Sequence, residues 1–209
     1  MDIAVLLYDR FTALDAIGPY EVLSRLPGAD LAFVAAEPGP VTTDNGMLTI
    51  LAQRSLSDMR GADILLVPGG PGEVAARAGS AALDWLKSAH QTSTWTTSVC
   101  TGSLILAAAG LLEGKRATTH WLAFDELVKL GAVPVHERVV FDGKLVTGAG
   151  VSAGIDMALT LVAKVAGPEL AQAIQLGIEY DPQPPFDAGS PAKAPQAIVD
   201  ALRAHSRFS

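Results

Sequence analysis

Short apolar runs alternate with stretches of helical periodicity along most of this chain. Three runs predict β-strands because apolar residues dominate them: residues 2–8, 31–36 and 63–67. A fourth strand is predicted at residues 93–99, which are rich in Thr, Trp and Val as a buried strand would be. The run 63–67 is almost wholly apolar, which is typical of a central parallel strand that is buried on both faces.

Helical patterns lie between and after these strands. They predict helices over residues 16–26, 81–89 and 151–165, and a Leu- and Ala-rich helix that follows position 100 and stops at Gly110. One face of the helix 151–165 is expected to be apolar and to carry Ile155, Ala158, Leu159, Val162 and Ala163.

Turn-forming residues mark the remaining segments. Asp142–Gly143 is a favoured two-residue turn, so residues 139–146 predict a β-hairpin. Residues 37–40 are rich in turn formers, and a short extended stretch is expected at 47–50. The segment 181–195 is rich in proline, glycine and alanine, so we expect it to cross the surface without regular structure before a last helix over residues 196–205.

Repeated strand–helix units of this length predict the α/β fold class. The expected architecture is a three-layer sandwich, in which a mostly parallel, doubly wound central sheet of the flavodoxin-like kind carries helices on both faces. The 209 residues fit a single domain, 1–209, that is large enough for a full core.

Composition narrows the class of partner. An apolar content of 49% and a mean hydropathy of +0.32 exclude a disordered chain. The net charge of −7 is opposite to that of a nucleic-acid-binding surface, so no nucleic-acid partner is expected. Because only 18% of the residues are charged, part of the surface is expected to be covered by a partner subunit.

The sequence also predicts a location. No apolar run approaches the roughly 18 residues that cross a bilayer, so no membrane partner is expected. The first residues lack a positively charged lead and predict a strand in place of a signal peptide. One cysteine excludes an internal disulfide and suits a reducing compartment, so we expect a cytoplasmic protein.

That single cysteine, Cys100, lies where the strand 93–99 meets the helix that follows. A cysteine at such a junction occupies a sharp turn, with its sulfur held outward and facing the positive end of the helix, which favours the thiolate. This is the geometry of a nucleophile elbow, with sulfur in place of the serine oxygen of hydrolases. The alternative is a buried free cysteine that acts as a small hydrophobe.

Two other loops are expected to meet Cys100, because ligands bind beyond the carboxyl ends of parallel strands. The first carries Asp15, whose carboxylate beside a thiol can transfer protons, although an aspartate there can also simply cap the helix that begins near residue 16. The second contains Gly69 and Gly70, whose N–H groups no side chain covers, as in an oxyanion hole. A phosphate loop is the rival interpretation, but the run lacks the required lysine.

The four histidines differ in their surroundings. His120 is expected in a loop between elements, where it can act as a general base or line the pocket. His90 ends a helix, His136 precedes the hairpin and His205 lies in the tail. They lack metal-ligand spacing and cysteine partners, so no metal site is expected.

Several of these segments resemble the DJ-1/PfpI superfamily, and within it the isocyanide (isonitrile) hydratases, over nearly the whole chain. The resemblance is carried by residues 14–19, 67–70, 98–103, 109–121, 134–140 and 184–191. The block Thr118–Trp121 is also similar to the amidase-like domains of AraC-type transcriptional regulators.

The resemblance implies a DJ-1-like fold, a Cys100 nucleophile, an Asp15 carboxylate beside it and a functional Thr101, with the Gly70 N–H as oxyanion donor. PfpI-type peptidases place histidine after the cysteine, so Thr101 argues against a peptidase. Many DJ-1-like members carry glutamate where this chain has Asp15, and aspartate is the hydratase-like residue.

The activity that the resemblance implies is the conversion of a small-molecule isocyanide to an N-substituted formamide by a homodimer, without a cofactor. Two alternatives from the sequence are a regulatory ligand-binding domain related to the AraC-type regulators and a redox sensor whose cysteine is oxidised. Such regulators need a helical DNA-binding region of about 100 residues after this domain, and only residues 192–209 remain for it here, so direct DNA binding is not expected.

Overall fold

A seven-stranded sheet forms the centre of the protein, which a computed structural model describes over residues 1–208. All neighbouring strands are parallel except the β10–β11 hairpin. In spatial order the strands are β10 (Val139–Asp142), β11 (Leu145–Gly148), β7 (Trp95–Val99), β6 (Ile64–Val67), β1 (Asp2–Leu6), β2 (Asp30–Ala35) and β5 (Arg54–Ser55).

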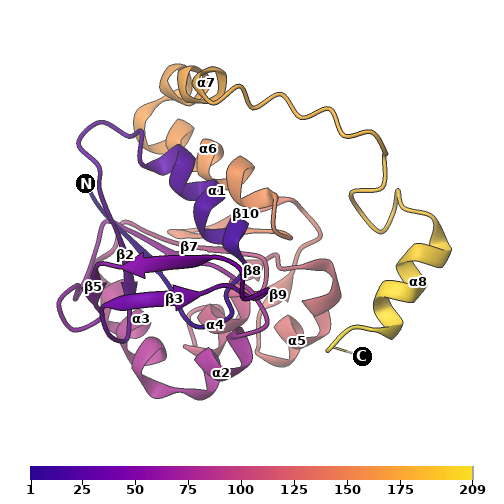
Figure 1. The fold of residues 1–209 in the computed structure, drawn as a ribbon, viewed down its shortest axis with the longest axis horizontal. Coiled ribbons are helices and arrows are strands. Elements are labelled where there is room, and N and C mark those ends of the chain that lie inside the picture. Colours follow the sequence, from indigo (N-terminus) through magenta and orange to yellow (C-terminus); the bar gives the residue numbers. More distant parts are fainter. Residues whose placement is uncertain (209) are drawn as a thin grey trace.

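Helices cover both faces of this sheet (Figure 1). One face packs against α1 (Ala13–Leu23), α6 (Ala153–Ala166) and α7 (Pro168–Gly177). The other packs against α2 (Glu73–Ala78), α3 (Ser80–Thr92), α4 (Gly102–Ala108), α5 (Phe124–Lys129) and the 3₁₀ turn Trp121–Ala123. Outside these layers lie the antiparallel pair β3 (Gly39–Thr42) and β4 (Thr49–Ala52), the parallel pair β8 (Arg116–Ala117) and β9 (Val133–Pro134), and α8 (Gln196–Ala204).

The period-two alternation of β1 explains why there are two apolar cores. Ile3 and Val5 face the cluster under α1 and α6, whereas Ala4 and Leu6 face the cluster under α3 and α4. All four side chains are buried, as expected of a central parallel strand. The predicted α/β sandwich is therefore confirmed.

The boundaries of several helices and strands differ between the prediction and the structure. The helix expected over residues 16–26 begins at Ala13 and ends at Leu23, so Asp15 lies in its first turn. The extended stretch 47–50 becomes β4, paired with β3 where only turns were expected. The hairpin 139–146, the irregular segment 181–195 and the last helix agree with the structure to within two residues.

The buried face of α6 is rotated from the expected one. Its buried residues are Ala153, Gly154, Met157, Ala158, Leu161 and Val162. Of the predicted set, Ile155, Leu159 and Ala163 are only half-buried. The difference arises because α6 packs against α1 and α7 as well as the sheet, and the side chains toward those helices keep part of their exposure.

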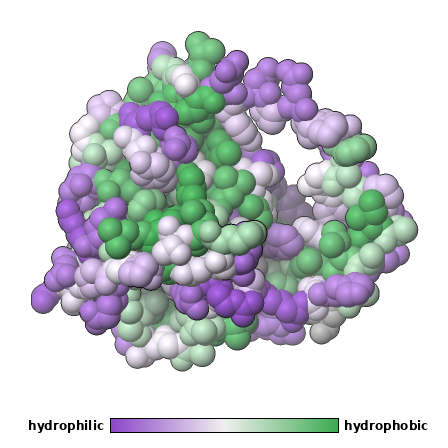
Figure 2. Space-filling view, in the orientation of Figure 1, coloured by the Kyte–Doolittle hydropathy of each residue, from purple (hydrophilic) through white to green (hydrophobic). Residues whose placement is uncertain are grey.

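Large hydrophobic side chains remain exposed on the face that carries the β3–β4 hairpin. Met47 is 85% exposed and Leu51 is 60% exposed, and Leu48 and Leu14 are also exposed. Figure 2 shows a band of hydrophobic residues on this face, over α1 and the hairpin. Within residues 1–208, no helix is long and apolar enough to span a bilayer.

The strand order β2-β1-β6-β7-β11 reverses direction between β1 and β6. In open α/β sheets such a reversal leaves a crevice beyond the carboxyl ends of the strands, where ligands bind. The loops that follow β1, β6 and β7 meet there, and they carry Asp15, Gly69 and Cys100.

Candidate active site

Cys100 directly follows β7 and has a left-handed backbone conformation, with φ of 57°. Its N–H donates to the carbonyl oxygens of Gly148 (3.1 Å) and Ala149 (2.9 Å). Its own carbonyl accepts from Ser103 Oγ and Thr119 Oγ1, both at 3.1 Å. A non-glycine residue in this conformation costs about 1–3 kcal/mol, so these bonds hold a strained turn. The predicted elbow is confirmed.

The state of the Cys100 thiol differs from the prediction. The residue is only 5% exposed, so the sulfur is not held outward. Burial raises the pKa of the thiol well above its ordinary value, and the charge of Asp15 raises it further. Backbone N–H groups of Val151 and Thr101 act in the opposite direction but do not compensate. The expected lowering of the Cys100 pKa is therefore not found.

Asp15 is the carboxyl group beside this thiol, and it is completely buried. Its Oδ2 accepts the N–H of Gly69 at 2.9 Å. Burial raises the pKa of Asp15 to about 7, although the bond from Gly69 and the interaction with Cys100 lower it in part. Asp15 is not the helix cap: Thr12 occupies that position, and the Thr12 hydroxyl donates to Asp44 instead.

Gly69 and Gly70 lie at the site, but their N–H groups are not free to bind an oxyanion, because both already donate hydrogen bonds within the protein. Gly69 donates to Asp15, and Gly70 donates to Thr101 Oγ1 at 3.0 Å. A Cβ atom on Gly69 would lie 2.5 Å from the Thr101 nitrogen, and Gly70 has a φ of 135°. The loop requires glycine because backbone packs directly on backbone, and its donors position Asp15 and Thr101.

His120 is half-buried and caps the short 3₁₀ turn. Its Nδ1 accepts the N–H of Leu122 at 3.3 Å, which places the proton of the neutral ring on Nε2. Burial lowers the pKa of His120, and the nearby Arg207 lowers it further. His120 is therefore a neutral hydrogen-bond donor and is poorly suited to act as a general base.

A cavity of about 600 Å³ opens beside the elbow. Two of its lining residues contact Cys100: the Thr119 hydroxyl bonds to its carbonyl, and the Val151 N–H interacts with its thiol. Trp121 lines the same cavity, as do Phe124 and His136, whose rings are 4.0 Å apart. The volume and the aromatic lining suit an organic ligand.

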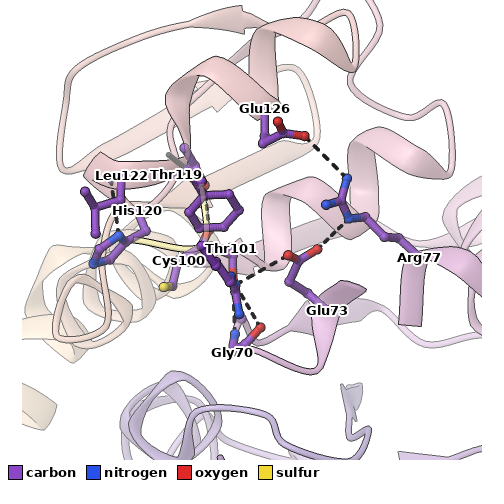
Figure 3. A network of polar contacts seen from close by, with 12 residues as sticks. Gly70, Glu73, Arg77, Cys100, Thr101, Thr119, His120, Leu122 and Glu126 are labelled. Atoms are coloured by element: carbon purple, nitrogen blue, oxygen red, sulfur yellow. Dashed lines mark hydrogen bonds and ion pairs between the residues drawn. The ribbon is translucent and has the colours of Figure 1, made fainter. Parts of the chain in front are cut away.

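Two further residues at this site, Glu73 and Arg207, were not predicted from the sequence. The fully buried Glu73 forms ion pairs with Arg77 (2.7 Å) and with Arg207 of the C-terminal segment (3.4 Å). In Figure 3 the Cys100 sulfur and the His120 ring lie on one side of Thr101, and Glu73 lies on the other. Glu73 follows the glycine run and was a detectable signal, but no local pattern marks Arg207.

In the part of the chain that the structure describes, no three His, Cys, Asp or Glu side chains converge to form a metal site. The polar side chains that meet at the elbow are the Cys100 thiol, the Asp15 carboxyl group, His120 and three hydroxyl groups, those of Thr101, Ser103 and Thr119. They supply a nucleophile, a proton carrier and hydrogen-bond donors.

The fold and this site define a class of protein: flavodoxin-like α/β proteins with a cysteine on a nucleophile elbow and a carboxyl group beside it. Residues 1–164 match the model of the DJ-1/PfpI family, and the chain belongs to that family.

Comparisons with known proteins give three informative relatives. The chain is 47% identical to an isonitrile hydratase of Pseudomonas putida, over 97% of this chain and 89% of that protein. It is 34% identical to the HTH-type transcriptional regulator CdhR of Pseudomonas aeruginosa, over 76% of this chain but only 48% of the regulator. A ThiJ/PfpI family protein from Pseudomonas syringae has a similar structure, with a TM-score of 0.94 and 41% identity over 97% of this chain and 84% of that chain.

Proposed function

We propose that this chain is an isocyanide hydratase, which adds water to R–N≡C to give the N-substituted formamide R–NH–CHO. The observation that carries the proposal is the buried pair of Cys100 and Asp15 on an elbow beside an aromatic-lined cavity. The 47% identity to an isonitrile hydratase supports the same reaction.

In the first step, Asp15 accepts the thiol proton of Cys100 as the sulfur attacks the terminal carbon of the isocyanide. Asp15 then delivers that proton to the same carbon, so the product is the covalent thioimidate R–N=CH–S–Cys100. A pKa of about 7 suits this exchange, because the carboxyl group holds and releases a proton near neutral pH.

In the second step, Asp15 takes a proton from a water molecule whose oxygen adds to the thioimidate carbon, and Asp15 passes that proton to the nitrogen. The C–S bond of R–NH–CH(OH)–S–Cys100 then breaks, the hydroxyl loses its proton to give the formamide, and a proton returns to sulfur through Asp15. The thiol and the carboxylate are regenerated, and the cycle needs no cofactor, redox step or metal.

The remaining site residues position these groups. The Gly70 N–H fixes the Thr101 hydroxyl, whose oxygen acts as acceptor and leaves its proton free to donate toward the reacting atoms. The Nε2–H of His120 donates into the cavity and orients the substrate nitrogen or the formamide oxygen.

The direct test is to mix the protein with cyclohexyl isocyanide and to measure formamide formation. We expect turnover by the natural chain and none by Cys100→Ala. Intact-protein mass spectrometry of the natural chain, quenched with acid during turnover, should show an adduct whose added mass equals that of the isocyanide. Asp15→Asn should show little of it, because its amide cannot accept the thiol proton in the first step. Normal turnover by Cys100→Ala would exclude covalent catalysis.

A redox sensor is a weaker alternative for this site. Sensor cysteines are exposed and have a lowered pKa, whereas Cys100 is buried and its pKa is raised. A regulatory ligand-binding role is supported by the match to the transcriptional regulator, of which this chain covers about half. Isocyanide turnover separates the hydratase from both.

We also propose that residues 1–209 act as a unit within a cytoplasmic homodimer. The low content of charged residues and the exposed hydrophobic side chains of the β3–β4 hairpin support a covered face. The single cysteine supports a reducing compartment.

A further inference from the structure

The C-terminal segment 181–208, called the arm below, leaves α7 and returns to the candidate active site. Residues 181–195 form no helix or strand, and α8 follows them (Figure 1). The arm lies beyond residues 1–164, which match the family model. The arm therefore lies outside the matched segment and yet reaches the elbow of Cys100.

The end of the arm is anchored by Arg207. Its Nη2 lies 3.2 Å from the Gly70 carbonyl oxygen, 3.4 Å from Glu73 Oε1 and 3.5 Å from Thr101 Oγ1. A fully buried carboxylate such as Glu73 requires cationic partners, and Arg207 is one of the two that it has. Phe208 packs against the apolar core that lies under α3 and α4. The anchor is thus both ionic and apolar.

The middle of the arm forms the outer wall of the cavity beside Cys100. Gly189, Ser190, Pro191 and Arg203 line it from the arm, opposite the aromatic residues of the protein body. The Arg203 guanidinium lies over the Trp121 ring at 5.8 Å from its centre. The size of the space beside the sulfur therefore depends on where the arm is held.

We propose that the arm is the specificity-determining wall of the substrate site, and that Arg207 is the residue that positions it. The inference rests on the proposed function: the cavity takes the substituent R of the isocyanide, and the arm limits its bulk. Without the anchor the wall moves outward, so bulky substituents gain access to Cys100 while small ones gain little.

The test uses the size dependence of Cys100 alkylation, which does not require isocyanide turnover. Because Cys100 is the single cysteine, labelling by iodoacetamide and by pyrenyl maleimide reports small and bulky access to one atom. In Arg207→Met the ratio of bulky to small labelling rates should rise about tenfold. In Ser190→Phe, which fills the cavity from the arm, the ratio should fall below that of the natural chain.

Two comparisons complete the design. Arg54→Met removes another partly exposed, ion-paired arginine, which bonds to Asp30 at the β5 edge of the sheet, and it should leave the ratio unchanged. Arg207→Lys keeps the charge and should fall between the natural chain and Arg207→Met. If Arg207→Met does not fold, as judged by circular dichroism, Ser190→Phe carries the test. Unchanged ratios in the folded arm variants would overturn the inference.

The kinetic counterpart is the ratio of kcat/KM for 2-naphthyl and n-butyl isocyanide, which should shift in the same directions. If neither isocyanide is turned over by the natural chain, the proposed function fails, while the labelling ratios still decide the role of the arm.

Discussion

Asp15 and Cys100 form a coupled pair in which burial opposes both negative charges. The pKa of Asp15 is raised to about 7 and that of Cys100 is raised above its ordinary value, so near neutral pH the pair moves from two protons to one. The form with one proton is the competent one, because it offers a carboxylate to accept the thiol proton.

This assignment predicts the pH dependence of the activity. As pH rises through about 7, Asp15 ionises and kcat/KM for cyclohexyl isocyanide should rise to a plateau. Asp15→Asn should slow turnover by about 10²-fold or more and lose this rise. A rise near pH 7 that persists in Asp15→Asn would assign it to another group.

The same carboxyl group affects stability. Because the pKa of Asp15 is about 7 in the folded protein against 3.8 ordinarily, the folded state binds the extra proton between these values, and the free energy of unfolding falls as pH rises through that window. The stability of Asp15→Asn should not fall in this window, because an amide does not ionise. Its amide oxygen can still accept the N–H of Gly69. In urea unfolding, the free energy of unfolding of Asp15→Asn relative to that of the natural chain should increase from pH 4 to pH 7. The increase should approach about 4 kcal/mol as an upper bound and then stay constant. A constant difference across that window would contradict a buried, raised Asp15.

Among individual residues, the sequence predicted those whose place follows from a strand–turn–helix junction. Cys100, Asp15 and Gly69 come just after parallel strands, so topology brings them together. The pKa of the thiol was predicted wrongly because it depends on burial, which tertiary packing decides. Arg207 could not be predicted, because it contacts Gly70 across 137 positions of sequence.

The elements around the site are held by close backbone contacts. A Cβ atom on Gly102, at the start of α4, would lie 2.1 Å from the Val67 carbonyl oxygen at the end of β6. The helix after the elbow therefore packs against the neighbouring strand with no room for a side chain.

Gly102→Ala is expected to destabilise the protein by about 3 kcal/mol or more, because α4 must separate from β6, and to reduce turnover together with stability. The matched control is Gly177→Ala at the end of α7, where nothing lies within 4 Å of the added Cβ. That change should stabilise by up to about 1 kcal/mol through helix propensity. Equal melting temperatures for the two variants would show that the contact is dispensable.

Most of the longer elements were predicted, although the ten-residue helix α7 was not, and the shortest elements were missed. The strands β1, β2 and β6 carry continuous apolar runs, and β7 is rich in Thr, Trp and Val. By contrast, β5, β8 and β9 have two residues each, and α2 and α5 have six, which is too short for a period to be recognised. The two-residue strands form because neighbouring strands supply their hydrogen bonds.

Over the whole molecule, the exposed hydrophobic residues of the β3–β4 hairpin are the surface that the proposed dimer would bury. Sedimentation equilibrium should give twice the 21.7 kDa of one chain. Leu51→Glu, at a side chain that is 60% exposed, should shift the protein toward the monomer while leaving the fold intact.

The control is Val128→Glu on α5, which is 50% exposed and lies in the helix layer on the opposite side of the central sheet from α1. It should leave the mass unchanged. A monomer in the natural chain, or a dimer that tolerates Leu51→Glu, would place the subunit contact elsewhere or remove it.

The backbone of Cys100 makes all of its bonds without help from the side chain: two accepted by Gly148 and Ala149, and two donated by Ser103 and Thr119. The backbone at position 100 should therefore keep its conformation when selenium replaces sulfur. Selenocysteine placed there would put a heavier, more acidic atom at the same point in space. The pH dependence of its alkylation would then report the acidity of the atom itself, separately from the geometry that holds it.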